Sequence, residues 1–251
     1  MTQESVRNDW NKLWQHQDHS TTSSGLLTLL TKLYILPPSP PSNYFLAEWL
    51  SQKLSLREMS VVEIGGTGTL GLILCKKVKS YTLIDYTKSA IEEASRVLKN
   101  CPNVNCLRAD MFDYNTEKVY DLVISSGLIE HFFDENIKRC LEAHARLSRK
   151  YVCVSAPADN PLNWWRAFGN HVIREYPNWR PMPEKQLFDI CMECSLDPVA
   201  MTRMDPYYGQ PNRCGRLGSV LRRWIAAYSP KKNWALDRSD GGLAAMLVKK
   251  C

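Results

Sequence analysis

The sequence has no apolar run long enough to cross a membrane, no recognisable signal peptide and no internal repeat. Its longest apolar stretch, residues 25–36, is interrupted by Thr31 and Lys32 and falls short of the roughly 18 residues that a membrane span needs. The first residues lack the basic and then apolar pattern of a secretory signal. We therefore expect a soluble, cytoplasmic protein.

Cysteines spaced as a disulfide framework or a zinc site are also lacking. The count of nine is odd, and Cys75, Cys140 and Cys153 fall within apolar segments, where cysteine usually serves as a small buried hydrophobe. Cys191 and Cys194 form a C-x-x-C, but no second Cys or His pair stands at the spacing that zinc requires. The sequence therefore predicts no metal and no redox centre at this motif.

The net charge of +6 is mild, but many of the basic residues gather late in the chain. An anionic substrate or a nucleic acid would suit this skew, and a solvated basic face explains it equally well. The residues concerned are Arg203, Arg213, Arg216, Arg222, Arg223, Lys231, Lys232 and Arg238.

Short β-rich runs alternate with helical patterns from residue 60 onward. This alternation predicts an α/β fold, a doubly wound parallel sheet covered by helices on both faces. The expected strands are residues 60–65, 81–85, 104–110, 120–126, 151–157, 199–204 and 243–248. The expected helices between them are residues 69–77, 88–99, 134–148 and 184–194.

The length of 251 residues suits one domain with elaborations. We expect residues 1–58 to form an N-terminal helical cap on a core of residues 59–157, with insertions at 158–183 and 205–242. The cap holds two amphipathic patterns, and Ser42 or Asn43 is placed to cap the second helix. Their apolar residues are Val6, Trp10, Leu13 and Trp14, then Leu46, Trp49, Leu50 and Leu54.

The turn after the first strand, Val61–Leu72, matches two cofactor loops. Gly66, Gly68 and Gly71 fit the dinucleotide fingerprint G-x-G-x-x-G, while the letters from Glu63 onward are similar to a loop that binds S-adenosylmethionine. Either cofactor needs glycines here, because a side chain would keep the backbone N–H groups from the ligand. The carboxylate of Asp85, 19 residues after Gly66, suits a ribose in either case.

Three features separate the two cofactors. Glu63 is a carboxylate inside a strand that dinucleotide-binding proteins keep apolar, and it therefore indicates a polar site. The pair Asp110 and Met111 closes the third strand, where it resembles an adenine pocket. The fourth-strand motif "YDLVISSGLIEHF", residues 120–132, is similar to that of class I methyltransferases.

Residues 60–157 thus resemble the class I S-adenosylmethionine-dependent methyltransferases, especially the small-molecule branch that includes ubiquinone and menaquinone biosynthesis enzymes. The resemblance implies a seven-stranded sheet whose last strand is antiparallel. It departs from the family at the glycine loop, where Glu63 to Gly68 span six positions instead of seven, or Thr67 and Thr69 replace two glycines. The implied cofactor-binding residues are Glu63, Gly65, Gly66, Gly68, Asp85, Tyr86, Asp110, Met111 and Ser126.

Methyl transfer from a sulfonium is an in-line displacement that needs a positioned nucleophile and, for some acceptors, a base. His131 is the predicted base, oriented by Glu130 or Asp134, and Ser125 and Ser126 should face the same site. Some quinone methyltransferases hold a metal with Glu-x-x-Glu-His at this place. Here Gly127 stands where the first Glu would be, and we predict no metal.

Two other histidines bear on this choice. His171 is the second candidate base, because it lies in an insertion that also holds Trp164, Trp165, Phe168 and Tyr176. His144 shares the apolar face of its helix and is expected in the core.

The expected reaction is methyl transfer to oxygen or nitrogen of a small molecule, and aromatic or anionic acceptors are the candidate classes. A nucleic-acid methyltransferase is the alternative, although adenine-directed enzymes usually carry Asn/Asp-Pro-Pro-aromatic where this chain has Ser-Ser-Gly-Leu. A non-catalytic protein that binds S-adenosylmethionine is another. A nicotinamide oxidoreductase would leave Glu63 and the fourth-strand motif unexplained.

Overall fold

A computed structural model describes residues 39–114, 116–117, 119–161, 163–164, 179–205, 224–227 and 242–250. The predicted first helix, most of both insertions, and His171 lie outside these residues. Within the described part of the chain, no helix is both long and apolar enough to span a membrane.

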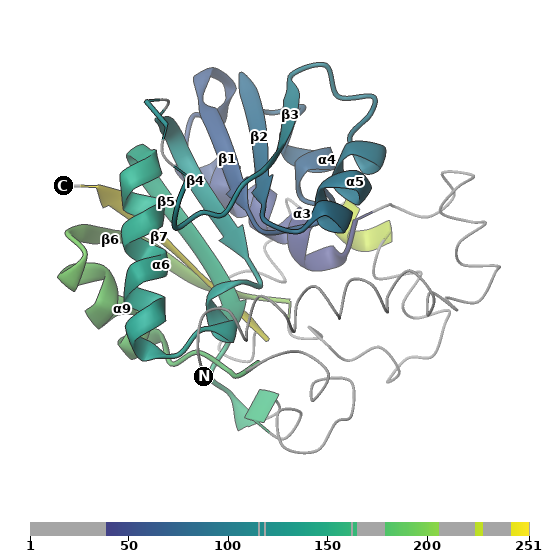
Figure 1. The fold of residues 1–251 in the computed structure, drawn as a ribbon. Coiled ribbons are helices and arrows are strands. Elements are labelled where there is room, and N and C mark those ends of the chain that lie inside the picture. Colours follow the sequence, from purple (N-terminus) through teal and green to yellow (C-terminus); the bar gives the residue numbers. More distant parts are fainter. Residues whose placement is uncertain are drawn as a thin grey trace.

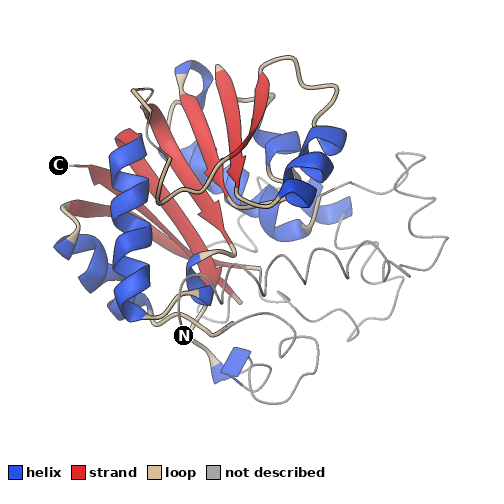
Figure 2. Cartoon of the chain, viewed as in Figure 1, coloured by secondary structure: helices blue, strands red, loops and turns tan. Residues whose placement is uncertain are grey.

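The core is a seven-stranded sheet in the order β3-β2-β1-β4-β5-β7-β6 (Figures 1 and 2). Strands β1 to β5 run parallel, and β7 lies antiparallel between β5 and β6. This order confirms the doubly wound fold and the antiparallel last strand. The strands are β1 Ser60–Ile64, β2 Ser80–Asp85, β3 Val104–Arg108, β4 Tyr120–Ser126, β5 Ser148–Pro157, β6 Leu196–Met204 and β7 Leu243–Lys250.

Helices cover both faces of the sheet. Helices α6 and α9 pack side by side on one face, and α3, α4 and α5 lie on the other (Figure 1). They are α3 Pro41–Lys53, α4 Gly71–Leu74, α5 Lys88–Val97, α6 Asp134–Leu147 and α9 Glu184–Glu193, with the 3-10 helices η1 Leu56–Glu58 and η2 Ile129–His131.

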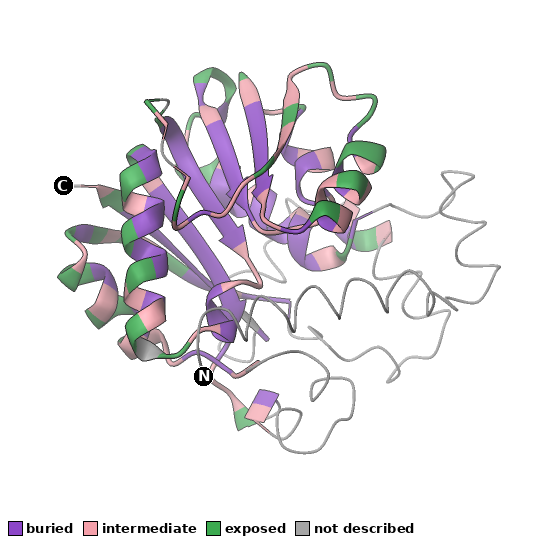
Figure 3. Ribbon diagram, in the orientation of Figure 1, coloured by how far each residue is buried: buried purple, intermediate pink, exposed green. Residues whose placement is uncertain are grey.

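Two apolar layers sandwich the sheet, because successive strand side chains point to opposite faces. Val61 joins the layer beneath α3, α4 and α5, whereas its neighbour Val62 joins the layer beneath α6 and α9. Both are fully buried, and the central strands are buried along most of their length (Figure 3). Burial on both faces explains why these strands read as continuous apolar runs.

Several predicted boundaries were right. Strand β4 begins and ends where it was expected, and α6 and α9 each end one residue before the predicted bound. Strand β5 begins three residues earlier than expected, at Ser148.

The predicted helix at 69–77 was too long, because α4 covers only Gly71–Leu74. Residues 69–70 and 75–77 form turns on either side of α4, and the chain must turn again to enter β2 at Ser80.

The prediction for α3 was wrong in two respects. The helix begins at Pro41, so Ser42 and Asn43 lie inside its first turn and do not cap it. Proline suits the first helical position, since its missing N–H would have no partner there. The helix is also buried around most of its circumference, including the polar residues Ser42 and Asn43, and is not amphipathic.

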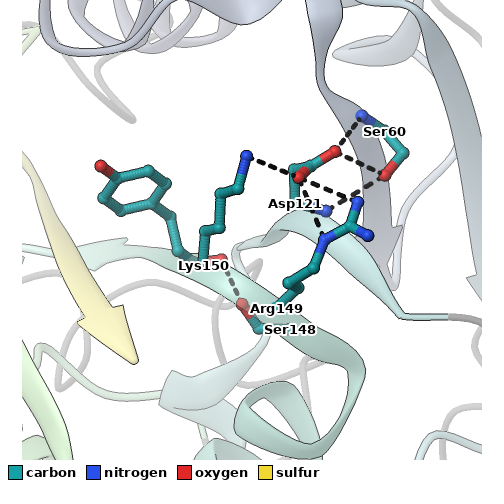
Figure 4. Close-up of polar contacts among 6 residues, drawn as sticks. Ser60, Asp121, Ser148, Arg149 and Lys150 are labelled. Carbon is teal, nitrogen blue, oxygen red and sulfur yellow. Dashed lines mark hydrogen bonds and ion pairs between the residues drawn. The ribbon is translucent and has the colours of Figure 1, made fainter. Parts of the chain in front are cut away.

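The amino edge of the sheet carries a compact polar cluster centred on Asp121 (Figure 4). One oxygen of its carboxylate accepts hydrogen bonds from the N–H and hydroxyl of Ser60, at 3.0 and 2.9 Å. The other oxygen lies 3.0 Å from Arg149 Nη2 and 3.1 Å from Lys150 Nζ. The cluster ties the amino ends of β1, β4 and β5 together.

Candidate cofactor and active site

The candidate site lies at the carboxyl edge of the sheet, where β1, β2 and β4 end at Ile64, Asp85 and Ser126. The strand order reverses between the neighbours β1 and β4. Ligands of doubly wound folds bind beyond the carboxyl ends of the strands at such a reversal. The residues predicted for the cofactor therefore come together at one edge.

The glycine turn is left-handed at three positions. Gly65, Gly66 and Gly68 have φ angles of 71°, 143° and 81°, which side-chain-bearing residues rarely adopt. A Cβ on Gly66 would also lie 2.8 Å from Glu63 Oε1. Gly71, by contrast, begins α4, where a Cβ would lie 2.9 Å from the ring of Tyr81. Gly71 is thus a packing glycine, and the fingerprint G-x-G-x-x-G does not describe this turn.

Glu63 is buried behind the glycine turn. The hydroxyl of Tyr81 donates to its Oε2 at 2.5 Å. Burial raises the pKa of Glu63 to about 7, the charge of Asp85 adds to the rise, and the Tyr81 hydrogen bond opposes it. The acid that the sequence placed at a polar site is therefore largely protonated below neutral pH.

Asp85 joins the end of β2 to the glycine turn. Its Oδ1 accepts from the N–H and the hydroxyl of Thr87 at 2.7 and 2.6 Å, and its Oδ2 lies 3.4 Å from the N–H of Gly66. Burial raises the pKa of Asp85, and the nearby charge of Asp110 contributes in the same direction. Such a carboxylate is held rigidly, as a group that selects ribose hydroxyls would have to be.

The loop after β3 brings Asp110 and Met111 to the same edge. Asp110 Oδ1 accepts from the N–H of Phe112 at 2.9 Å. Met111 is buried, and its carbonyl accepts from Arg146 Nη2 at 2.7 Å. Strand β3 ends at Arg108, two residues before the predicted bound, and this places both residues in the loop beyond the strand. Arg108 also donates to the carbonyl of Tyr86 at 3.1 Å.

Glu130 and His131 form the short helix η2 directly beyond β4, and both are buried. His131 Nε2 lies 3.9 Å from Glu130 Oε1. Among the described residues Glu130 Oε2 has no hydrogen-bond partner, and burial raises the pKa of Glu130 to about 8. At neutral pH Glu130 is mainly a neutral acid, so it does not orient His131 through a full negative charge.

The serines that end β4 have different surroundings. Ser126 is half-buried, and its hydroxyl oxygen accepts from the Ser155 hydroxyl at 2.8 Å. The hydroxyl of Ser125 is buried and has no partner among the described residues. Gly127 follows with a φ of 73°, and its N–H donates to the Ser155 carbonyl at 2.9 Å. The chain thus turns sharply between β4 and η2.

Two contacts join η2 and its approach to the cofactor loops. Leu128 lies against Gly65, with a methyl carbon 3.3 Å from where a Cβ would stand. Phe132 packs edge-on against Phe112 with ring centroids 5.9 Å apart. The predicted base and the predicted cofactor residues therefore belong to one packed unit.

A polar clamp that sequence reasoning missed fixes the glycine turn from the outside. Asn43 Nδ2 donates to the hydroxyls of Thr69 and Ser39, at 3.1 and 3.0 Å, and Ser39 donates to the Thr69 carbonyl at 2.9 Å. Thr69 stands where the family loop would carry a glycine. The polar "SPPSN" before α3 was visible in the sequence, but nothing in it indicated a partner 26 residues away.

The other predicted histidine of the described region lies away from the site. His144 is fully buried in α6, its Nδ1 lies 2.7 Å from the carbonyl of Cys140, and burial lowers its pKa to about 4. The expectation of a core histidine is confirmed. No three His, Cys, Asp or Glu side chains gather as metal ligands within the described ranges.

Comparison with known proteins finds a family match for the central part of the chain. Residues 61–150 match the family described as a methyltransferase domain. A curated relative, malonyl-acyl-carrier-protein O-methyltransferase 1 of Ilyobacter polytropus, is 30% identical over 84 residues. That match covers 32% of this chain and 31% of the relative, so it spans about a third of the relative's length.

Solved structures share the fold across most of the chain. The magnesium protoporphyrin IX methyltransferase of Synechocystis PCC 6803 with bound S-adenosylmethionine has a TM-score of 0.56 at 13% identity, over 84% of this chain and 78% of that one. The N-methyltransferase NodS of Bradyrhizobium japonicum WM9 with S-adenosylhomocysteine has the same TM-score and identity, over 84% and 88%. At such identities the likeness concerns the fold.

Proposed function

We propose that the chain is a class I S-adenosylmethionine-dependent methyltransferase that transfers a methyl group to oxygen or nitrogen of a small-molecule acceptor; the match of residues 61–150 to a methyltransferase domain supports this proposal. One observation carries the proposal. A left-handed glycine turn lies between two acids, the buried Glu63 and the partly buried Asp85, at the point where the strand order reverses. This combination suits a cationic nucleoside ligand better than a dinucleotide.

The cofactor-binding roles follow from the chemistry of the groups present. The Gly65–Gly68 turn leaves room for a ligand beside the backbone, and Asp85 would accept hydrogen bonds from the ribose hydroxyls. Asp110 would accept from the exocyclic amine of adenine, with Met111 against the ring. Glu63 would support the turn and favour a positive ligand once it is ionised. Tyr86 and Ser126 would line the same cavity.

S-adenosylmethionine supplies a methyl group whose leaving sulfur is already activated. The protein must therefore hold the acceptor in line, exclude water and remove a proton where the acceptor has one to lose. His131 is our candidate acceptor for that proton, since it lies in η2 just beyond β4, where the neighbouring Leu128 and Phe132 contact the cofactor loops. A proton on His131 would favour the ionised form of Glu130, 3.9 Å away, and the ion pair would stabilise the imidazolium.

The acceptor class rests on the loop after β4 and on the relatives. This loop reads Ser-Ser-Gly-Leu, residues 125–128, and lacks the proline-aromatic grip of adenine-directed enzymes. The curated relative is named as an O-methyltransferase and one structural neighbour as an N-methyltransferase, and both kinds of acceptor atom are therefore retained. A nucleic-acid substrate is the second choice.

Calorimetry with S-adenosylmethionine and, separately, NADH tests the proposal most simply. We expect micromolar binding of the first and no heat from the second. Binding of NADH alone would replace the proposal with a nicotinamide oxidoreductase. A panel of phenols, carboxylic acids, amines and short oligonucleotides, assayed for S-adenosylhomocysteine release, then distinguishes catalysis on a small molecule from catalysis on nucleic acid and from binding without turnover.

A further inference from the structure

Two thiols outside the site face each other closely. The sulfurs of Cys75 and Cys101 lie 2.9 Å apart, although the residues are 26 positions apart in the chain. Cys75 directly follows α4, and Cys101 lies in the turn between α5 and β3. A covalent S–S bond is about 2.05 Å long, so a small side-chain movement would close the gap.

The backbone around both cysteines is firmly held. Asn103, two residues after Cys101, donates through Nδ2 to the carbonyls of Cys75 and Val78 at 2.9 and 3.1 Å. The N–H of Cys101 donates to the Leu98 carbonyl at 2.9 Å. The approach of the two sulfurs is thus fixed by hydrogen bonds that join the turn after α4 to the turn before β3.

In the C-x-x-C motif, by contrast, the sulfur of Cys194 is directed to another partner than Cys191. Cys191 is fully buried in the core, and Cys194 Sγ donates to the carbonyl of Lys138 at 3.8 Å. The sequence spacing that usually marks a redox pair therefore points to the wrong cysteines in this chain.

We propose that Cys75 and Cys101 are an oxidation site that closes to a reversible disulfide when the protein meets a hydroperoxide. Cys101 is half-buried and meets the oxidant first, whereas Cys75 is buried. The Cys101 sulfur gives two electrons to the peroxide O–O bond, which breaks to leave a sulfenic acid and one molecule of water or alcohol. Cys75 then attacks that sulfur, the S–O bond breaks, and the departing hydroxide takes the Cys75 proton as water. A small thiol reduces the bond again.

The order of these two steps agrees with the surroundings of the thiols. Burial and the neighbouring Cys101 raise the pKa of Cys75 to about 12, so this thiol resists direct oxidation. Its nearness to Cys101 compensates in the second step, because the reacting atoms are already in contact. The bond would close a loop that contains β2 and α5 and would restrict the unfolded chain.

Peptide mapping of the full chain without reductant, after stoichiometric hydrogen peroxide, tests the proposal. Trypsin places Cys75 in one peptide and both Cys101 and Cys106 in another, because Lys76, Lys99 and Arg108 are cleavage sites. We expect one cross-linked pair of these peptides. It should be lost in Cys75→Ala and Cys101→Ser and kept in the matched controls Cys106→Ser and Cys194→Ser.

The melting temperature of the same samples provides a second measurement. The oxidised wild-type chain should melt roughly 5 to 10 °C higher than the reduced one, and dithiothreitol should reverse the rise. The proposal is overturned if the cross-link joins other cysteines, or if Cys101 proceeds to sulfinic acid without a cross-link. A lower melting temperature on oxidation would overturn it as well, because the bond would then distort the native packing.

Discussion

At the amino edge of the sheet the carboxylate of Asp121 is surrounded by donors, whereas at the carboxyl edge Glu63 and Glu130 have few. Asp121 accepts hydrogen bonds from Ser60 and forms ion pairs with Arg149 and Lys150. Although burial acts in the opposite direction, these hydrogen bonds hold its pKa well below the usual range. Among the described residues neither Glu63 nor Glu130 has a lysine or arginine partner, and burial raises both pKa values.

From this contrast we infer that the amino edge serves the fold and that the carboxyl edge serves a ligand. A buried acid that is surrounded by donors stabilises the native state by itself. Buried acids without a cation cost stability, and such costs persist mainly at functional sites. The carboxyl edge also contains glycines in left-handed conformations, which is a second feature that is typical of a ligand site. We infer that a cationic ligand offsets the cost there, and four sets of substitutions test the contrast.

Asp85→Ala should have the largest effect. Removing the carboxylate that faces the glycine turn should weaken S-adenosylmethionine binding roughly 100-fold or more, because charge-assisted hydrogen bonds to the ligand are lost. Calorimetry measures this loss. Asp121→Asn is the matched acid at the other edge and should leave the affinity within about twofold. Equal affinities for Asp85→Ala and wild type would refute the assignment.

His131→Ala should lower turnover by roughly 100-fold or more at unchanged S-adenosylmethionine affinity, which is the size of general-base effects. Glu130→Gln should lower turnover less than tenfold at pH 7, because the amide of Gln resembles the neutral carboxylic acid that burial already favours at this position. Rates of S-adenosylhomocysteine formation with an identified acceptor give both values. A fully active His131→Ala enzyme would remove this residue as the base.

Asp121→Ala should lower the free energy of unfolding by about 2 kcal/mol, because the partly buried N–H and hydroxyl of Ser60 lose their acceptor. Arg149 and Lys150 are half-exposed and contribute little to this figure. Urea titration of the reduced protein measures the change. The folded variant should bind S-adenosylmethionine normally; a loss of binding would contradict the separation of the two edges.

The clamp on the glycine turn should give the smallest effect. Asn43→Ala and Thr69→Val should each weaken S-adenosylmethionine binding by roughly three- to tenfold, and the double variant should be no weaker than the worse single variant. Ser51→Ala, on the same helix, removes a hydrogen bond to the Ala47 carbonyl and serves as control. Additive losses would show that Asn43 and Thr69 do not act together.

The sequence predicted the sheet well because its signals are local. Short β-rich runs alternate with helices, and the fourth strand was placed at its correct bounds. The pairing of Asp85 with the glycine turn also followed from spacing within one βαβ unit. The length of α4 could not be read in this way, since residues 69–70 and 75–77 form turns although their letters continue the helix pattern.

Contacts between distant segments were beyond the sequence. Nothing in the letters around Asn43 indicates Thr69, and nothing near Cys75 indicates Cys101. The protonation of Glu130 is likewise a product of burial by several elements. The roles of the candidate site residues stay predictions, because the structure shows only that they lie together.

The most direct test of the central claim is the pH dependence of S-adenosylmethionine affinity relative to that of S-adenosylhomocysteine. The two ligands share their amino, carboxyl and nucleoside groups, so their ratio isolates the sulfonium charge. In the free protein Glu63 and Glu130 lose their protons near pH 7 and pH 8. A cation favours the ionised forms, so its binding releases protons and strengthens as pH rises. We predict that the preference for S-adenosylmethionine grows from pH 6 to about pH 9 and levels off above that, where both acids are ionised in the free protein; a preference that is flat or falls between pH 6 and pH 9 would contradict the account.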